Sequence, residues 1–433
     1  MTATQDHRLT VGALVAASAV VLLSACAGGA GTADGEGGGG SGSGSGSGFA
    51  YGASQEEVDA VVADLDPVEI TFQAGAMSPD AMSAPNGHHF QEYVEERSGG
   101  KISVDVVWGQ SIAGYGEIDD ALADGRIDVS YALPIYQPAE HPEFDALATA
   151  TAGMPNSPVL GEMIGNAALV DMAWSSDALL ATYEEQGLTP LTPMISTGTY
   201  LSACGEAGTS LDDYDGRQVR IASVAHEQQV TELGGSPVSL EYVEVFEALQ
   251  RGTVDCTITQ LPTAEETGLL EVATNLAYTT EENSLSGRSA GANLGGVGYR
   301  NLPLAYQQII FDSHTGGFAS SNSVIAEGNA RAIDQLMEAG GEIGPMDEDA
   351  DQRIGETNDE LLADVEESEV IGSDVQGRMA EAVEKWRQVA DELGYTEEGG
   401  FENMHEWFNA DDYDFAPFAD QVFQETALAH RPS

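Results

Sequence analysis

Arg220 is the residue whose type and place in the sequence point most directly to chemistry. It lies inside Gln218–Ile221, a short run that alternates as a β-strand does. A planar guanidinium offers two parallel N–H donors to the two oxygens of a carboxylate, a geometry that lysine cannot match. Because the chain has only 15 lysine and arginine residues, an arginine within a strand needs a partner. Either a ligand carboxylate or one of the chain's own acidic side chains could be that partner.

Cys26 is a second residue with recognisable chemistry, because its thiol can take a lipid. It follows an uncharged run, residues 11–23, that is too short to span a bilayer in a mature protein. The run leads into Leu-Ser-Ala-Cys at 23–26, which resembles the lipobox of bacterial lipoproteins. We therefore expect a signal peptide at 1–25 and a lipidated Cys26 that holds the protein on the outer, extracytoplasmic face of the cell membrane. An ordinary signal peptide with a chance cysteine is the alternative.

Two cysteines, Cys204 and Cys256, remain after Cys26 is assigned to a lipid. An exported protein reaches a compartment that permits disulfides, so these two residues are predicted to pair. Closing a loop of about 50 residues would stabilise the fold by roughly 4 kcal/mol in the chain-entropy model. Two separate buried thiols are the alternative.

The composition excludes one class of partner. Aspartate and glutamate number 72 against 15 lysine and arginine, so the formal net charge is −57. A protein of that charge is repelled by nucleic acid, which is excluded as a partner. The acidic residues are scattered along the chain, which is typical of a surface adapted to brine, where salt screens their mutual repulsion. A simple drift toward acidity is the alternative.

The sequence contains no His-Glu-x-x-His zinc site. His88 and His89 are adjacent, so on a helix they would point to different sides and form a poor metal pair. We therefore expect no catalytic residue, no metal and no cofactor, and no enzymatic activity.

The elements that must position these residues follow from the periodicity of the chain. Residues 26–66, which are rich in Gly and Ser at their start, are predicted as a flexible tether, with the folded part beginning near Pro67. Strand and helix patterns then alternate, which indicates βα units and a mostly parallel sheet. Two such halves are separated by a partly helical middle at 158–186. The expected strands are 68–73, 102–107, 127–131, 218–221, 238–240 and 254–259.

Three stretches of the second half form a specific pattern: residues 211–220 read Leu-Asp-Asp-Tyr-Asp-Gly-Arg-Gln-Val-Arg, 233–238 read Leu-Gly-Gly-Ser-Pro-Val, and 243–255 read Val-Glu-Val-Phe-Glu-Ala-Leu-Gln-Arg-Gly-Thr-Val-Asp. These stretches resemble the binding proteins of tripartite ATP-independent periplasmic (TRAP) transporters. In the first half, 90–100 resembles the family's Phe-x-x-x-Val-Glu-Glu-x-Ser-Gly-Gly stretch. Weaker similarity extends the resemblance over 67–395.

This resemblance implies an α/β, two-lobed periplasmic-binding-protein-like fold with a ligand cleft between the lobes and a long helix that crosses both. Lobe one would comprise 67–197 plus 287–325, and lobe two 198–286 plus 326–433, with hinges near Thr197 and Ser286. Members of the family capture a small carboxylate-containing organic acid and deliver it to a TRAP-type membrane permease. The binding protein of an ATP-driven (ABC) importer, which has the same anchor and fold, is the alternative.

The resemblance also assigns site residues. It places Arg220 against the ligand carboxylate and predicts further positions in the cleft walls. These further ligand-binding candidates are Tyr242, Thr259, Gln260, Tyr115, Gln73 and Tyr200. Many members have a second arginine upstream of the matching strand, but 197–205 contains none, and Tyr200 stands in that region. A monocarboxylate ligand is therefore expected in preference to a dicarboxylate.

Overall fold

The structure is a computed structural model that describes residues 46–280 and 283–433. The predicted signal peptide, 1–25, and the predicted lipidation site, Cys26, lie outside the described residues.

A helix precedes the point at which the sequence placed the start of the folded part. Helix α1, Gln55–Val62, begins at a capping box formed by Ser54 and Glu57, and it buries Val58 and Val62. Phe49 is also buried, and its backbone N–H donates to the Gln308 side chain at 2.8 Å. The predicted tether, 26–66, is therefore wrong at its C-terminal end, because this segment has apolar side chains that pack against the rest of the molecule.

The first lobe is built on three parallel strands: β1 (Val68–Gln73) lies between β2 (Ile102–Val107) and β3 (Val129–Ala132). Helix α2, Pro85–Arg97, joins β1 to β2, and helix α3, Ile118–Asp124, precedes β3. The alternating apolar residues of β1 explain its burial, since Ile70 and Phe72 face the core. The predicted strands 68–73 and 102–107 are confirmed residue for residue.

The second lobe repeats this arrangement. Strand β5, Gln218–Ile221, lies between β6 (Ser236–Ser239) and β7 (Cys256–Thr259) and is parallel to both. Further strands and helices of this region are β8 (Asn275–Tyr278), β10 (Glu342–Pro345), α7 (Leu211–Tyr214), α8 (Val224–Glu232), α9 (Val245–Gln250) and α10 (Leu261–Glu266). Helices α8 and α9 connect the parallel strands β5, β6 and β7 in turn, as βα units require.

Two long strands connect the lobes. Strand β4, Thr189–Cys204, pairs antiparallel with β9, Leu285–Gly295, next to β3, while the end of β4 pairs with β7 and β8. The strand order β2-β1-β3-β9-β4-β7-β5-β6 therefore runs from one lobe into the other. Thr197 and Ser286 lie in these two strands, and their role as hinges stays a prediction.

Cys204 and Cys256 face each other on β4 and β7 and form a disulfide bond. Their Cα atoms lie 4.1 Å apart. Both residues are fully buried in a small hydrophobic core of the second lobe, together with Tyr214 and Val219. The pairing predicted from the cysteine count is confirmed.

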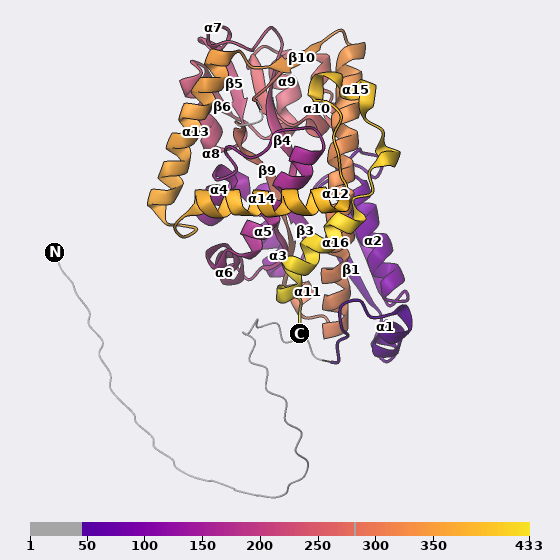
Figure 1. Cartoon of the computed structure of the whole chain (residues 1–433). Helices are drawn as coiled ribbons and strands as arrows, with labels where there is room; N and C mark the ends of the chain where they lie inside the picture. The colour runs from indigo at the N-terminus through magenta and orange to yellow at the C-terminus, as the bar shows by residue number, and fades with distance from the viewer. Residues whose placement is uncertain (1–45, 281–282) are drawn as a thin grey trace, which may run out of the picture. The chain divides into compact units, whose positions relative to one another are not determined.

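Helix α12, Leu304–Glu338, is the long helix of the molecule and packs against both lobes (Figure 1). It contacts α2 of the first lobe and α10 of the second. The remaining α-helices are α4 (Pro142–Thr149), α5 (Leu160–Trp174), α6 (Asp177–Glu185), α11 (Val297–Arg300), α13 (Glu348–Ser368), α14 (Val375–Leu393), α15 (Met404–Trp407) and α16 (Ala416–Glu425). The predicted α/β, two-lobed fold with a long crossing helix is confirmed.

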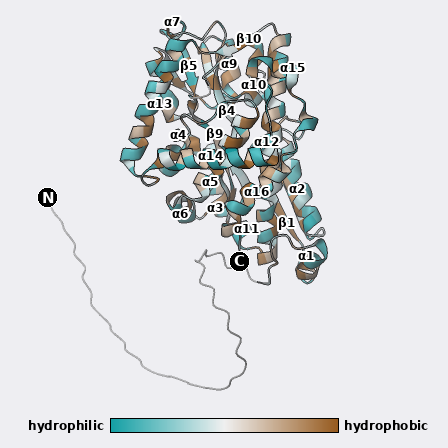
Figure 2. Cartoon of the chain, in the orientation of Figure 1, coloured by the Kyte–Doolittle hydropathy of each residue, from teal (hydrophilic) through white to brown (hydrophobic). Residues whose placement is uncertain are grey.

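Helix α14 is amphipathic, with one face toward the core and the other toward solvent. Its buried residues Val375, Met379, Ala382, Trp386 and Ala390 recur every three or four positions, and its other side is hydrophilic (Figure 2). Within 46–280 and 283–433, no helix is both long and apolar enough to cross a membrane.

Candidate functional site

A cavity of about 190 Å³ is lined by residues from both lobes and from α12. Lobe one contributes Tyr115 and Tyr136, lobe two contributes Arg220 and Tyr242, and α12 contributes His314. A site between two lobes is where ligand pockets often form, because neither lobe alone encloses enough surface. We therefore take this cavity as the candidate binding site.

Arg220 is held in the cavity wall by the backbone of its own lobe. It lies in β5 and is only 3% exposed. Its Nε donates to the carbonyl oxygen of Leu240 at 2.9 Å, and its Nη1 donates to that of Ile258 at 3.1 Å. Leu240 directly follows β6 and Ile258 lies in β7, so the two accepting carbonyls lie on either side of β5. The strand order of the second lobe therefore sets the orientation of the guanidinium.

The remaining nitrogen of Arg220, Nη2, is buried and makes no hydrogen bond of normal geometry with any described residue. No carboxylate in the described part of the chain forms an ion pair with this arginine. A buried cation without a counter-charge is costly. An anion that entered the cavity would supply that counter-charge.

Tyr136 of the first lobe lies next to Arg220 of the second lobe. It belongs to a short 3-10 helix, Pro134–Tyr136, directly after β3. Burial raises the pKa of Tyr136, and the positive charge of Arg220 partly opposes this rise. The phenol is therefore neutral at pH 7 and stands beside the guanidinium.

Tyr242, which begins the 3-10 helix Tyr242–Glu244, reaches across from the second lobe. Its hydroxyl accepts a hydrogen bond from Gln110 at 3.4 Å and lies 3.5 Å from the Met77 sulfur. Burial raises the pKa of Tyr242. The contact with Gln110 and Met77 means that the two lobes touch at the rim of the cavity.

The sequence-predicted residues Thr259, Gln260, Tyr115 and Tyr200 also line this cavity. Gln260 accepts a hydrogen bond from Thr263 at 2.7 Å through its side-chain oxygen. Tyr200 is 2% exposed and packs edge-on against His226, with ring centroids 4.4 Å apart. Six of the seven predicted positions, Arg220 and Tyr242 included, are thus brought together.

Gln73 is the exception and does not line the cavity. Its side-chain oxygen accepts from the backbone N–H groups of Ile112 and Ala113 at 3.1 and 3.2 Å, and its nitrogen donates to the Ala113 carbonyl at 2.9 Å. The side chain therefore holds the loop after β2 against the end of β1. The prediction that Gln73 faces the cleft is wrong, because the backbone of this loop takes its hydrogen bonds.

Tyr131 and Tyr136 are lining residues that the sequence reasoning missed. Tyr131 lies in β3, and Tyr136 follows that strand closely. Ligands in α/β folds bind beyond the carboxyl ends of parallel strands. This position at the end of a predicted strand was the signal that could have identified both tyrosines.

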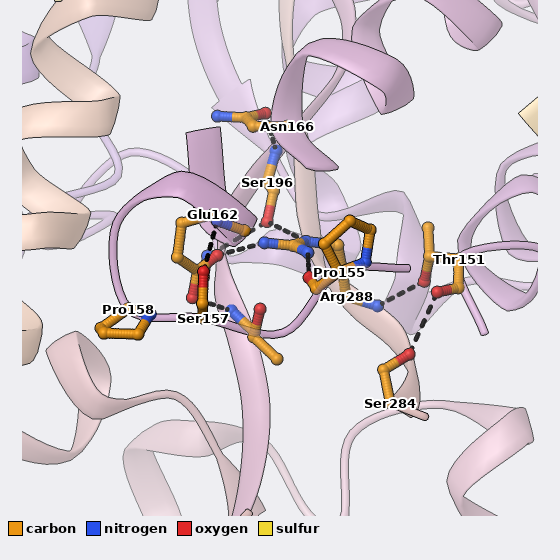
Figure 3. A network of polar contacts seen from close by, with 12 residues as sticks. Thr151, Pro155, Ser157, Pro158, Glu162, Asn166, Ser196, Ser284 and Arg288 are labelled. Atoms are coloured by element: carbon orange, nitrogen blue, oxygen red, sulfur yellow. Dashed lines mark hydrogen bonds and ion pairs between the residues drawn. The ribbon is translucent and has the colours of Figure 1, made fainter. Parts of the chain in front are cut away.

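A second buried arginine, Arg288, lies in β9 and is 0% exposed, but it is not part of the cavity lining. It forms an ion pair with Glu162 of α5, and its Nη1 donates to the Pro155 carbonyl at 3.3 Å (Figure 3). Its Nε donates to the Ser196 hydroxyl of β4 at 3.4 Å. The donors of Arg288 are therefore used inside the protein, at the level of the crossing strands.

The histidines of the first lobe have separate partners. His88 lies 2.8 Å from the Pro79 carbonyl and His89 lies 3.2 Å from that of Ser313, each through Nε2. In the described ranges, no three His, Cys, Asp or Glu side chains are grouped so that they could hold a metal ion.

Two α/β lobes, two crossing strands, a long helix over both lobes and a cavity lined by both of them define a two-lobed solute-binding protein. Comparison with known families agrees with this class. The chain matches the model of the bacterial extracellular solute-binding proteins, family 7, over residues 76–369 and belongs to that family.

Known relatives extend this result. The chain is 22% identical to the C4-dicarboxylate-binding periplasmic protein DctP of Rhodobacter capsulatus over 292 residues, which cover 65% of this chain and 81% of the relative. The resemblance to TRAP binding proteins that the motifs indicated is confirmed.

Two solved TRAP solute-binding proteins have the same fold. One comes from an unidentified microbe of a marine metagenome and contains pyroglutamate; its identity is 18% and its TM-score 0.62, with 74% of this chain and 100% of that chain covered. The other, from Bordetella bronchiseptica, contains (R)- and (S)-mandelate; its identity is 15% and its TM-score 0.65, with 75% and 100% covered.

Proposed function

We propose that this protein is an extracytoplasmic solute-binding lipoprotein that captures a small organic acid by its carboxylate and delivers it to a TRAP-type permease. The observation that carries the proposal is Arg220, a buried arginine of the cavity lining that forms no ion pair with a described carboxylate and whose Nη2 makes no hydrogen bond of normal geometry with a described residue. A carboxylate placed there would satisfy this donor and neutralise the guanidinium.

The charges of the cavity favour a monocarboxylate. Arg220 is the one lysine or arginine among the described lining residues, and Glu266 also contributes to the wall. The pKa of His314 is lowered to about 4 by burial, so this histidine is neutral at pH 7. A second ligand carboxylate would therefore meet no second cation, and Glu266 would repel it.

Relatives support the general class of ligand. The two solved structures contain pyroglutamate and mandelate, and the relative from Rhodobacter capsulatus is named for C4-dicarboxylates. All of these are carboxylic acids, which is the chemistry that an unpaired buried guanidinium selects.

The experiment is a calorimetric titration with pairs of compounds that differ only in charge, each acid being matched with its primary amide. Binding of the acid and none of its amide at the same concentration is expected, because the amide cannot neutralise the guanidinium. Equal binding of acid and amide would contradict the proposal.

The anchor and the permease are separate parts of the proposal. The anchor is supported by the lipobox-like sequence that ends at Cys26; mass spectrometry of the mature N-terminus tests it, and an unmodified cysteine would rule it out.

Uptake by whole cells distinguishes a TRAP permease from an ABC importer. Uptake through a TRAP permease should stop when the ion gradient is collapsed, whereas an ABC importer would continue while ATP is maintained.

A further inference from the structure

Of the five tyrosines that line the cavity with Arg220, four are Tyr115 and the three whose rings surround it, Tyr131, Tyr136 and Tyr242. The ring of Tyr115 is central to them, with its centroid 6.4 Å from that of Tyr131, 6.2 Å from that of Tyr136 and 6.3 Å from that of Tyr242. These separations and the tilts between the rings are those of interacting aromatic side chains. We call these four residues the tyrosine cluster.

The tyrosine cluster is drawn from both lobes. Tyr115 begins the 3-10 helix Tyr115–Glu117, Tyr131 lies in β3 and Tyr136 follows it, all in the first lobe, while Tyr242 comes from the second. A ligand enclosed by the cluster would touch both lobes at once. Its binding energy would therefore favour the form in which the lobes are closed.

Burial raises the pKa of every tyrosine in the cluster. At pH 7 the four phenols are consequently neutral and supply flat aromatic faces and hydroxyl groups, without charge. Hydroxyl groups of the cluster near Arg220 can donate to one ligand carboxylate. The aromatic faces farther from Arg220 can pack against a planar ring of the ligand.

The backbone around Tyr131 leaves room for its ring and holds it in place. A Cβ atom at Gly291 would lie 2.3 Å from the Tyr131 hydroxyl oxygen, and one at Gly75 would lie 2.8 Å from Cδ1 of the same ring. Any larger residue at either glycine would displace the ring. The position of Tyr131 is thus preorganised, which lowers the entropy that binding has to overcome.

The size of the cavity limits the ligand. Its volume is about 190 Å³, and a cavity of about 150 Å³ is large enough for benzene. One six-membered ring with a carboxylate fits this space. Apolar residues complete the wall on the side of the first lobe, among them Phe72, Phe90 and Leu133.

We propose that the ligand is an aromatic monocarboxylate with a single six-membered ring, its carboxylate on Arg220 and its ring among the tyrosine cluster. This inference rests on the proposed function and narrows it to one substrate class. An aliphatic acid of similar length would use Arg220 but would lose the ring contacts with the tyrosines.

The test is isothermal titration calorimetry on the full-length mature protein with matched probes. Benzoate is compared with cyclohexanecarboxylate, and phenylacetate with cyclohexylacetate, because each pair differs in aromaticity and little in size; propionate and succinate complete the set. At least one aromatic probe is expected to bind roughly ten-fold tighter than its saturated counterpart and than the two aliphatic acids.

Variants locate the effect in the tyrosine cluster. Tyr115→Leu should lower the affinity for the tighter-binding aromatic probe roughly ten-fold and change the affinity for propionate little. Tyr115→Phe keeps the ring, so its affinity for the same probe should stay within about three-fold of the wild type. Tyr278→Phe is a control, because Tyr278 does not line the cavity and its hydroxyl donates to Glu402 at 2.7 Å.

The possible failures are distinguishable. If a saturated counterpart or succinate binds as tightly as the aromatic probes, the ring inference is overturned while a carboxylate site at Arg220 stands. The same holds if Tyr115→Leu leaves the aromatic probe unaffected. If none of the acids binds, the proposed function itself is overturned, and the inference with it.

Discussion

At the scale of single residues, Arg220 combines a fixed orientation with an unused donor. Two backbone carbonyls accept hydrogen bonds from its Nε and Nη1, and the buried Nη2 has no hydrogen-bond partner of normal geometry among the described residues. Because the carbonyls belong to the strand framework, the guanidinium does not need to reorganise when an anion arrives. Because less free energy is spent on ordering the side chain, more of the free energy of the charge-assisted hydrogen bonds contributes to the binding affinity.

Replacing Arg220 by lysine should separate charge from geometry. Lys keeps the positive charge but has no planar pair of donors, so we expect affinity for the bound acid to fall about ten-fold to several hundred-fold, since charge-assisted hydrogen bonds contribute roughly 1.5–3 kcal/mol each. Arg220→Ala should weaken binding further, because the ligand charge would be buried without a partner. Calorimetry measures both effects.

Arg251→Lys is the matched control for this substitution. Arg251 lies in the same lobe but is 69% exposed and pairs with Glu247 on one helix face. Its replacement should leave ligand affinity unchanged. An Arg220→Ala protein that bound the acid as the wild type does would contradict the carboxylate site.

At the scale of elements, the crossing strands are tied to α5 by one carboxylate. Glu162 accepts from the backbone N–H of Thr199 in β4 at 2.8 Å and pairs with Arg288 of β9. The side chains of Glu162 and Arg288 are 3% and 0% exposed. The pair lies where two strands pass between the lobes, so it fixes the strands relative to the helix (Figure 3).

Glu162→Gln should destabilise the whole fold, because it leaves the Arg288 charge buried without its counter-charge. Removing one member of a buried ion pair costs about 3–5 kcal/mol. Urea unfolding followed by circular dichroism measures this loss. Glu247→Gln breaks the exposed pair with Arg251 and should change stability by less than about 1 kcal/mol. Equal stability of the two variants would show that the buried pair does not hold the crossing strands.

At the scale of the whole molecule, charge is the dominant feature. With 72 acidic residues and 15 lysine and arginine residues, most carboxylates cannot have a basic partner. Their mutual repulsion opposes the compact state, and salt reduces it by shortening the Debye length from about 10 Å at 0.1 M to about 3 Å at 1 M.

The melting temperature should consequently rise with salt. Between 0.1 and 1 M NaCl we expect an increase of roughly 5–10 °C, which corresponds to a few kcal/mol for a protein of this size. Differential scanning fluorimetry measures it, and KCl should act as NaCl does, because screening depends on ionic strength alone. A melting temperature that stays constant over this range would refute the screening argument.

Much of this protein could be predicted from the sequence because the signals were local. The alternation of Val68–Gln73 and Ile102–Val107 predicted two strands with their bounds, and the count of cysteines predicted the Cys204–Cys256 bond. The motifs around Arg220 indicated the family. Even α1, which the prediction placed in the tether, carried a local signal, the Ser-x-x-Glu capping box at 54–57.

The tertiary structure alone decided how the site is composed. Tyr115 and Tyr242 are 127 positions apart in number yet their rings lie 6.3 Å apart, and the partners of Gln73 are backbone groups about 40 positions away. Arg288 finds its carboxylate 126 positions away. The periodicity of the sequence does not encode such pairs. Whether a polar side chain faces a cavity or is hydrogen-bonded within the protein depends on the distant backbone and side-chain groups that folding brings within hydrogen-bond distance.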